Sequence, residues 1–271
     1  MESYVLITGA TGGLGKAFAV ECANRGWNLF LTDLSEEQLC SLATNLMNTY
    51  GIRTIYFSCD LTDAAERQKL ISHVHCSNIS FSTLINVAGL DYEGLFSDRS
   101  PEQIRTLIRL NIEANLEITA EVLKLRNRIK PFRIINVASL AAYYSMPVKA
   151  MYAASKQFLL SFSMALREEL KPYGVTVTAL CPAGMPTTSE CIKAIECQGF
   201  AGRITTKNVG YVAAKTIDHA LKGHAVYIPG KLNQLLRLLS SLIPSMVLTR
   251  LIGSRWQKAG ARNFRKLVDT I

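Results

Sequence analysis

The chain has 271 residues, of which 49% are apolar and 19% are charged, a balance that indicates a packed globular protein and excludes intrinsic disorder. The formal net charge is +9, but eight basic residues and one acidic residue follow position 230, so this tail carries +7 of that total. The rest of the chain is nearly neutral, and no nucleic-acid partner is expected.

Strand-like and helix-like segments alternate along the chain. Apolar runs rich in β-branched residues predict strands at Tyr4–Thr8, Leu29–Thr32, Ile52–Ser58, Thr83–Val87, Phe132–Ala138, Val175–Cys181 and Ala225–Ile228. Helical periodicity predicts helices at Leu14–Arg25, Glu36–Tyr50, Ala64–Cys76, Pro101–Arg128, Ala150–Tyr173 and Lys207–Lys222. The alternation predicts an α/β fold with a doubly wound, seven-stranded parallel sheet and helices on both faces.

A glycine-rich turn, Thr8-Gly9-Ala10-Thr11-Gly12-Gly13-Leu14-Gly15, lies between the first predicted strand and the first predicted helix. Glycines permit the tight turn and let a pyrophosphate approach the backbone, while free N–H groups at the helix start face the phosphates. This context predicts a Rossmann-type dinucleotide site. Its expected contacts are Gly9, Thr11, Gly12, Gly13, Leu14 and Gly15.

Asp33 closes the second predicted strand, where an acidic side chain would hold the hydroxyls of an adenosine ribose. A carboxylate there repels the additional 2′-phosphate of NADP, and Leu34 and Gly12 supply no compensating positive charge. NAD is therefore the expected cofactor, in preference to NADP. The alternative is that Asp33 is a turn residue.

Tyr152 and Lys156 lie four residues apart on a predicted helix and share one face, with Ser139 upstream. A neighbouring ammonium favours the phenolate, so Lys156 is expected to lower the pKa of Tyr152. Together with a hydroxyl that holds the substrate oxygen, this set suits proton transfer in reversible alcohol oxidation. The alternative is a Tyr–Lys pair on a helix surface.

Further motifs follow in order along the chain: Asp60-Leu61, Asn86-Val87-Ala88-Gly89, Asn111, and the segment Pro182 to Thr187. With the glycine turn and the Ser139, Tyr152 and Lys156 set, the chain resembles a single-domain short-chain dehydrogenase/reductase over about residues 3 to 230. The resemblance implies a catalytic set of Asn111, Ser139, Tyr152 and Lys156.

The resemblance also assigns roles around the cofactor. Asp60, with Leu61, would lie near the adenine, Asn86 would brace the sheet, and Ala88 and Gly89 would line the cofactor cleft. Asn111 would anchor a water that relays protons to Lys156, and Lys156 would bind the nicotinamide ribose. The remaining cofactor contacts would be Tyr152, Pro182, Gly184 and Thr187, although Ala183 interrupts the Pro-Gly pair that the family usually shows.

The substrate site is predicted to be largely apolar. One wall would come from Met185, Ile192, Ile195 and Phe200, and the other from Ala141, Tyr143, Tyr144 and Met146. An apolar secondary alcohol or ketone, hydroxysteroid-like or 3-hydroxyacyl-like, fits such walls better than a sugar, whose hydroxyls each need a partner. The alternative is a catalytically silent NAD-binding sensor or scaffold protein with the same fold.

Seven scattered cysteines with no Cys-x-x-Cys motif favour reduced thiols, and no signal-type apolar stretch is seen, so a cytoplasmic protein is expected. The cluster His73-Val74-His75-Cys76 lacks further ligands, and no metal site is predicted.

We expect one domain at 1–230 that includes a substrate loop at 186–207, with 231–271 as a helical C-terminal extension. Residues 231–258 are leucine-rich and basic but too short and too broken to span a bilayer. They are expected to pack over the pocket, to form the interface of a homo-oligomer, or to lie on a membrane surface.

Overall fold

The computed structural model describes residues 2–187, 191–192 and 204–254. It contains the predicted seven-stranded sheet, which is entirely parallel and has the order β3-β2-β1-β4-β5-β6-β7. The strands are β1 (Ser3–Thr8), β2 (Asn28–Asp33), β3 (Thr54–Ser58), β4 (Ser80–Asn86), β5 (Phe132–Val137), β6 (Val175–Leu180) and β7 (Val226–Tyr227). The strand order reverses between β1 and β4, the place where parallel α/β sheets form ligand crevices.

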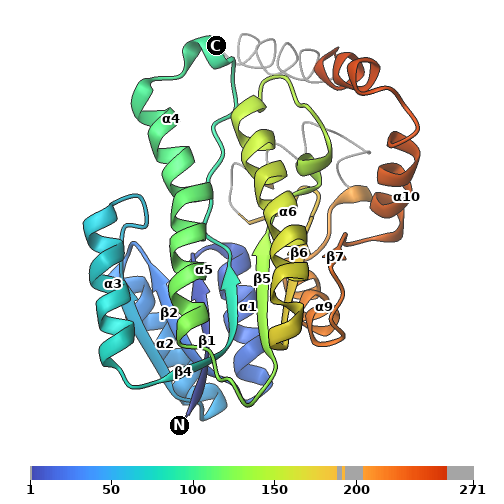
Figure 1. The fold of residues 1–271 in the computed structure, drawn as a ribbon. Helices are drawn as coiled ribbons and strands as arrows, with labels where there is room; N and C mark the ends of the chain where they lie inside the picture. Colours follow the sequence, from blue (N-terminus) through green and yellow to red (C-terminus); the bar gives the residue numbers. More distant parts are fainter. Residues whose placement is uncertain (1, 188–190, 193–203, 255–271) are drawn as a thin grey trace.

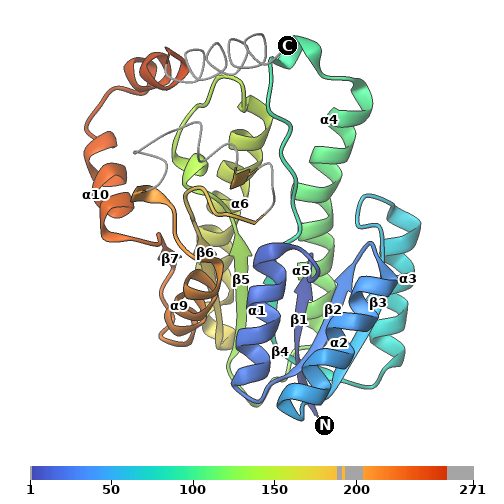
Figure 2. The same cartoon turned by 180° about the vertical axis from the view of Figure 1, so that it is seen from behind.

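Helices cover both faces of the sheet, as predicted (Figure 1). One face carries α1 (Gly13–Asn24), α2 (Glu36–Tyr50) and α9 (Val209–Leu221), which Figure 2 shows in front of the strands. The other carries α3 (Ala64–Cys76), α4 (Pro101–Ile108), α5 (Ala114–Lys124) and α6 (Ala150–Leu170). Two large apolar clusters, one on each side of the strands, form most of the core, and a third small one contains Ala138, Ala179 and Cys181.

The predicted helix Pro101–Arg128 is wrong as a single element. A π-helical turn, η2 (Arg109–Glu113), separates α4 from α5, and α5 ends at Lys124. Hydrophobic periodicity cannot distinguish this insertion from continuous helix, because the apolar face continues through it. Smaller boundary errors have local causes: α6 ends at Leu170, and the 3₁₀ turn η4 (Lys171–Tyr173) contains Pro172.

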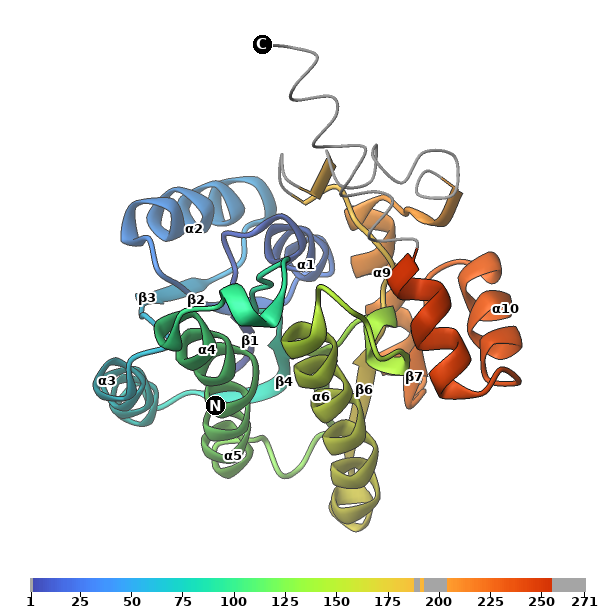
Figure 3. The ribbon, with the colours of Figure 1, turned by 90° about the horizontal axis from the view of Figure 1, so that it is seen from above.

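Two helices follow β7 at the edge of the sheet, α10 (Lys231–Ser240) and a second at residues 245–254 (Figures 1 and 3). Among the helices that the structure describes, none is both long enough and apolar enough to traverse a lipid bilayer. The division of the chain at residue 230 stays a prediction.

Candidate active site

The glycine turn lies at the carboxyl end of β1, where its glycines make close backbone contacts. A Cβ atom at Gly15 would lie 1.9 Å from the Gly9 oxygen, and one at Gly9 would lie 2.9 Å from the Ala88 Cα. At Gly13 it would lie 2.8 Å from the Thr187 oxygen. The turn therefore meets both the end of β4 and the segment after β6, which are far apart in sequence.

The start of α1 carries no side-chain cap. Gly12 is its N-cap and supplies no side-chain cap, so no side chain of the turn occupies the first N–H groups. Leu14 is buried in the core beneath. Helix starts of this kind bind phosphate through free N–H groups and the positive end of the helix dipole, so the residues present fit a dinucleotide pyrophosphate.

Asp33 lies at the end of β2 and faces the glycine turn. Its carboxylate accepts hydrogen bonds from the Thr11 backbone N–H at 2.8 Å and the Thr11 hydroxyl at 2.7 Å. Its other oxygen accepts from the Leu34 N–H, also at 2.8 Å. The structure thus connects Asp33 directly to Thr11, and the carboxylate is fixed at the edge of the predicted ribose position.

Asp60 follows β3, and its Oδ1 accepts hydrogen bonds from the backbone N–H and hydroxyl of Thr62. Leu61 is buried, and its carbonyl accepts a hydrogen bond from the guanidinium of Arg67. The N-cap of α3 is Asp63. Asp60 therefore shapes the loop at the sheet edge through local bonds.

The end of β4 is braced by buried amides. Asn86 Nδ2 donates to Thr119 Oγ1 at 3.0 Å and to Asn136 Oδ1 at 2.9 Å, which joins β4 to α5 and β5. The Thr8 hydroxyl accepts from the backbone N–H groups of Val87 and Ala88. These bonds hold the Ala88-Gly89 segment beside the glycine turn.

Tyr152 and Lys156 both face the carboxyl end of β5 from α6. Lys156 is buried, its Nζ donates to the Val137 carbonyl at 2.8 Å, and it lies 5.7 Å from the centre of the Tyr152 ring. Ser139, directly after β5, accepts a hydrogen bond from the Ala141 N–H at 3.1 Å and interacts with the Tyr152 hydroxyl. The predicted trio is therefore brought together in one place.

The expected depression of the Tyr152 pKa is wrong for this structure. Burial raises the pKa of Tyr152, and the hydrogen bond with Ser139 only partly opposes this. Burial also lowers the pKa of Lys156, to about 8. The charges around Tyr152 do not offset its burial, because Lys149 lowers its pKa whereas Asp91 raises it.

Asn111 lies in the π-helical turn and is buried. Its Oδ1 accepts from the Leu90 N–H at 2.9 Å, and its Nδ2 donates to the Leu90 carbonyl and to Ser155 Oγ, each at 3.0 Å. A Cβ at Gly89 would lie 3.1 Å from Lys156 Nζ and 3.2 Å from Asn111 Oδ1. Asn111 thus lies near Lys156, while its role in a water relay stays a prediction.

Sequence reasoning missed a second cation beside Tyr152. Lys149 Nζ lies 5.8 Å from the Tyr152 ring centre, 2.5 Å from Asp91 Oδ2 and 3.1 Å from Glu93. Burial lowers the pKa of Lys149, but the two carboxylates outweigh this and raise it. The sequence does show a basic residue three positions before Tyr152, but Lys149 is the N-cap of α6 and lies outside the helix that was predicted to begin at Ala150.

The predicted substrate walls are only partly as expected. Ala141, Tyr144 and Met146 lie just after Ser139, but the Tyr143 hydroxyl interacts with Cys181, and Arg237 lies 4.6 Å over its ring. Burial raises the pKa of Tyr143 to about 12. Met185 packs against the apolar core, and Ile192 is exposed. Ile195, Phe200 and most of the loop 186–207 lie outside the described residues.

The segment after β6 crosses the site. The Pro182 carbonyl accepts from the Leu140 N–H at 2.8 Å, and Gly184 is exposed. Thr187 Oγ1 donates to Cys191 Sγ at 3.4 Å. The segment with the predicted contacts Pro182, Gly184 and Thr187 therefore runs from the neighbourhood of Ser139 to the glycine turn.

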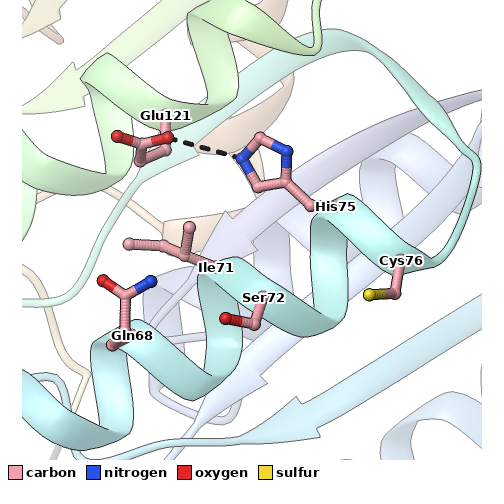
Figure 4. Close-up of a pocket in the computed structure, with 6 residues that line it drawn as sticks. All are labelled: Gln68, Ile71, Ser72, His75, Cys76 and Glu121. Atoms are coloured by element: carbon pink, nitrogen blue, oxygen red, sulfur yellow. Dashed lines mark hydrogen bonds and ion pairs between the residues drawn. The ribbon is translucent and has the colours of Figure 1, made fainter.

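A separate hollow of about 340 Å³ lies between α3 and α5 (Figure 4). His75 faces Glu121 there, with 3.4 Å between Nε2 and Oε2, whereas Cys76 points away from that pair. The lining residues are Gln68, Ile71, Ser72, His75, Cys76 and Glu121, none of which belongs to the predicted site.

Comparison with known proteins finds a matching family and several relatives of this chain. The family model described as short chain dehydrogenase matches residues 3–193. A very-long-chain 3-oxoacyl-CoA reductase of Laccaria bicolor is 30% identical over 66% of this chain and 53% of its own length. A 17-beta-hydroxysteroid dehydrogenase type 3 of Homo sapiens is 31% identical over 69% of this chain and 60% of its own. The aligned part is therefore only about half to three fifths of these relatives.

Solved structures agree in fold. A short-chain dehydrogenase from Sphingobium yanoikuyae in complex with NADPH has a TM-score of 0.74 and 27% identity, covering 89% of this chain and 96% of its own. A 7beta-hydroxysteroid dehydrogenase has a TM-score of 0.83 at 23% identity, covering 92% and 96%, and this likeness concerns the fold alone.

Proposed function

The chain belongs to the short-chain dehydrogenase family, and from this premise we propose that it is a nicotinamide-dependent oxidoreductase that interconverts a secondary alcohol and a ketone. The observation that carries the proposal is the meeting of Ser139, Tyr152 and Lys156 at the carboxyl end of β5. A sensor or scaffold has no need of such a set.

The glycine turn, Asp33 and the Ala88-Gly89 segment are the residues that would hold the dinucleotide. The nicotinamide ring, when bound, supplies or accepts the hydride. Lys156 would hold the adjacent ribose. The raised pKa of Tyr152 keeps its hydroxyl protonated near neutral pH, which suits donation of that proton to a ketone oxygen. Ser139 would hold the same oxygen, and the reverse reaction returns the proton to Tyr152.

The substrate is proposed to be apolar, either hydroxysteroid-like or 3-hydroxyacyl-like. Ala141, Tyr144 and Met146 support this class, and the relatives from Homo sapiens and Laccaria bicolor are named for a hydroxysteroid and a 3-oxoacyl-CoA. The test is turnover of the purified chain with NAD or NADP against hydroxysteroids, 3-hydroxyacyl thioesters and small secondary alcohols. Cofactor binding without turnover across that panel would favour the sensor.

NAD is proposed as the preferred cofactor, because the carboxylate of Asp33, which Thr11 holds in place, would repel a 2′-phosphate bound beside it. An Asp33→Asn substitution keeps the shape of the side chain and removes its charge. We expect the ratio of kcat/KM for NADP to that for NAD to rise by ~10-fold or more. The ratio is measured with one substrate under identical conditions, and an unchanged ratio removes Asp33 from cofactor selection.

Lys149 is expected to set the pH dependence of oxidation. In Lys149→Met the Asp91 carboxylate faces Tyr152 without its ion-pair partner, which favours the neutral phenol and raises the pKa of Tyr152 further. Oxidation needs Tyr152 deprotonated to accept the proton, so the rising, low-pH limb of kcat/KM for alcohol oxidation should move to higher pH. Lys149→Arg keeps the charge and should restore the wild-type profile. Superimposable profiles for all three proteins would contradict this expectation.

A further inference from the structure

Helix α10 packs on the rest of the protein through polar side chains. Three of its polar side chains, those of Asn233, Arg237 and Ser240, contact the body of the protein. Asn233 is buried, and its Nδ2 donates to the carbonyls of Thr205 at 2.9 Å and Pro229 at 2.7 Å. Arg237 lies over the Tyr143 ring, and Ser240 Oγ donates to the Tyr144 hydroxyl at 3.1 Å. A helix that packs by burying an apolar stripe has the opposite arrangement.

The leucines of this element face outward. Ten of the 24 exposed large apolar side chains among the described residues lie within 231–254, and Leu242 is 79% exposed. We call this set the C-terminal apolar face: Leu232, Leu235, Leu236, Leu238, Leu239, Leu242, Ile243, Met246, Val247 and Leu251. Singly scattered apolar residues need no explanation, but ten exposed apolar side chains gathered within one segment of 24 residues indicate a docking surface.

The charges around the face identify its partner. Residues 231–254 contain Lys231, Arg237 and Arg250 and no acidic residue, and the sequence beyond them continues strongly basic. In a two-fold dimer built on this face, the basic groups of both copies would meet each other. An anionic phospholipid surface instead accepts apolar side chains and basic side chains together.

We propose that α10 and residues 245–254 dock on the surface of an anionic phospholipid bilayer. The leucines enter the boundary between headgroups and acyl chains, and the exposed Lys231 and Arg250 bind lipid phosphates. The association is peripheral, since none of the helices described is suited to crossing a bilayer.

The docking helices are connected to one wall of the candidate active site. Ser240 bonds Tyr144, Arg237 covers Tyr143, and a Cβ at Gly253 would lie 3.0 Å from Pro147. All three contacts fall on the segment between Ser139 and Tyr152. Membrane docking therefore holds this wall near the lipid surface. The inference goes beyond the proposed reaction and does not depend on it.

The test is sedimentation of the full chain with vesicles. We expect binding to vesicles that contain phosphatidylglycerol, weak binding to pure phosphatidylcholine vesicles, and a loss of binding as salt is raised. Leu238→Glu/Leu242→Glu places two acids on the C-terminal apolar face and should weaken the phosphatidylglycerol binding by at least ~10-fold. The matched control, Ile129→Glu/Tyr173→Glu, changes charge equally at two exposed sites outside the C-terminal apolar face, one before β5 and one before β6, and should bind like wild type.

The Lys231→Glu/Arg250→Glu variant tests the contribution of the basic side chains to vesicle binding. It leaves the leucines in place, so it still tests the proposal if the leucine variant does not fold. It should bind phosphatidylglycerol vesicles weakly while melting like wild type. Wild-type protein that stays in the supernatant with phosphatidylglycerol vesicles overturns the proposal. So does light scattering that shows a dimer broken by the leucine substitutions without any change in vesicle binding, because a second copy then covers the face.

Discussion

A Tyr152→Phe variant is expected to lose alcohol–ketone turnover by about 10²- to 10⁴-fold, the range for removal of a general acid–base group. The substitution removes only the hydroxyl, so the ring remains between Lys149 and Lys156. Affinity for the cofactor should change little, because the glycine turn and Asp33 are untouched. The measurements are kcat with the best substrate of the panel and cofactor titration by fluorescence.

The matched control is Tyr173→Phe, which removes a hydroxyl from an exposed tyrosine before β6 and should leave both quantities unchanged. Near-normal turnover by Tyr152→Phe would remove Tyr152 from proton transfer. Loss of cofactor binding together with turnover would point to a structural role instead. Retained binding with lost turnover is the result that the proposed mechanism requires.

The sheet could be predicted because parallel strands leave two signals in a sequence. Each is a short apolar run, and each is separated from the next by an amphipathic helix, which leaves a parallel crossover as the physical solution. The glycine turn could also be predicted from the sequence. Gly15 lies so close to the Gly9 oxygen that only glycine fits there, and this requirement appears in the sequence as a glycine. Local chemistry determined both features.

The features that could not be predicted depend on tertiary packing. The π-helical turn at 109–113 places Asn111 against Leu90 and Ser155, contacts that span 21 and 44 positions. The pKa of Tyr152 depends on burial, which spacing along a helix does not reveal. The outward leucines of α10 reverse the usual rule that the apolar stripe of a helix marks its inner face.

Arg67 is the residue whose loss should most affect stability. Its side chain is fully buried, and it donates to the Leu61 carbonyl at 2.9 Å, to Glu117 Oε2 at 2.6 Å and to Glu113. One guanidinium thereby joins the loop after β3 to the π-helical turn and α5. The two glutamates raise the pKa of Arg67 even though burial lowers it, so the group stays charged.

Arg67→Met is therefore expected to lower the free energy of unfolding by about 2–3 kcal/mol. The figure lies below the full cost of breaking a buried ion pair, because the glutamate side chains are 43% exposed and water can solvate them. Urea denaturation followed by circular dichroism measures the change. Arg105→Met, which breaks an exposed pair with Glu102, should cost no more than about 0.5 kcal/mol.

A second substitution separates charge from packing at this site. In Arg67→Met the carboxylates of Glu113 and Glu117 face each other without a cation, so Arg67→Met/Glu117→Gln should recover part of the lost stability. Because Arg67 also holds the Leu61 carbonyl beside the predicted adenine position, the single variant should bind NAD more weakly while kcat at saturating NAD is preserved. An unchanged urea midpoint in Arg67→Met would show that packing alone joins the loop to the π-helical turn.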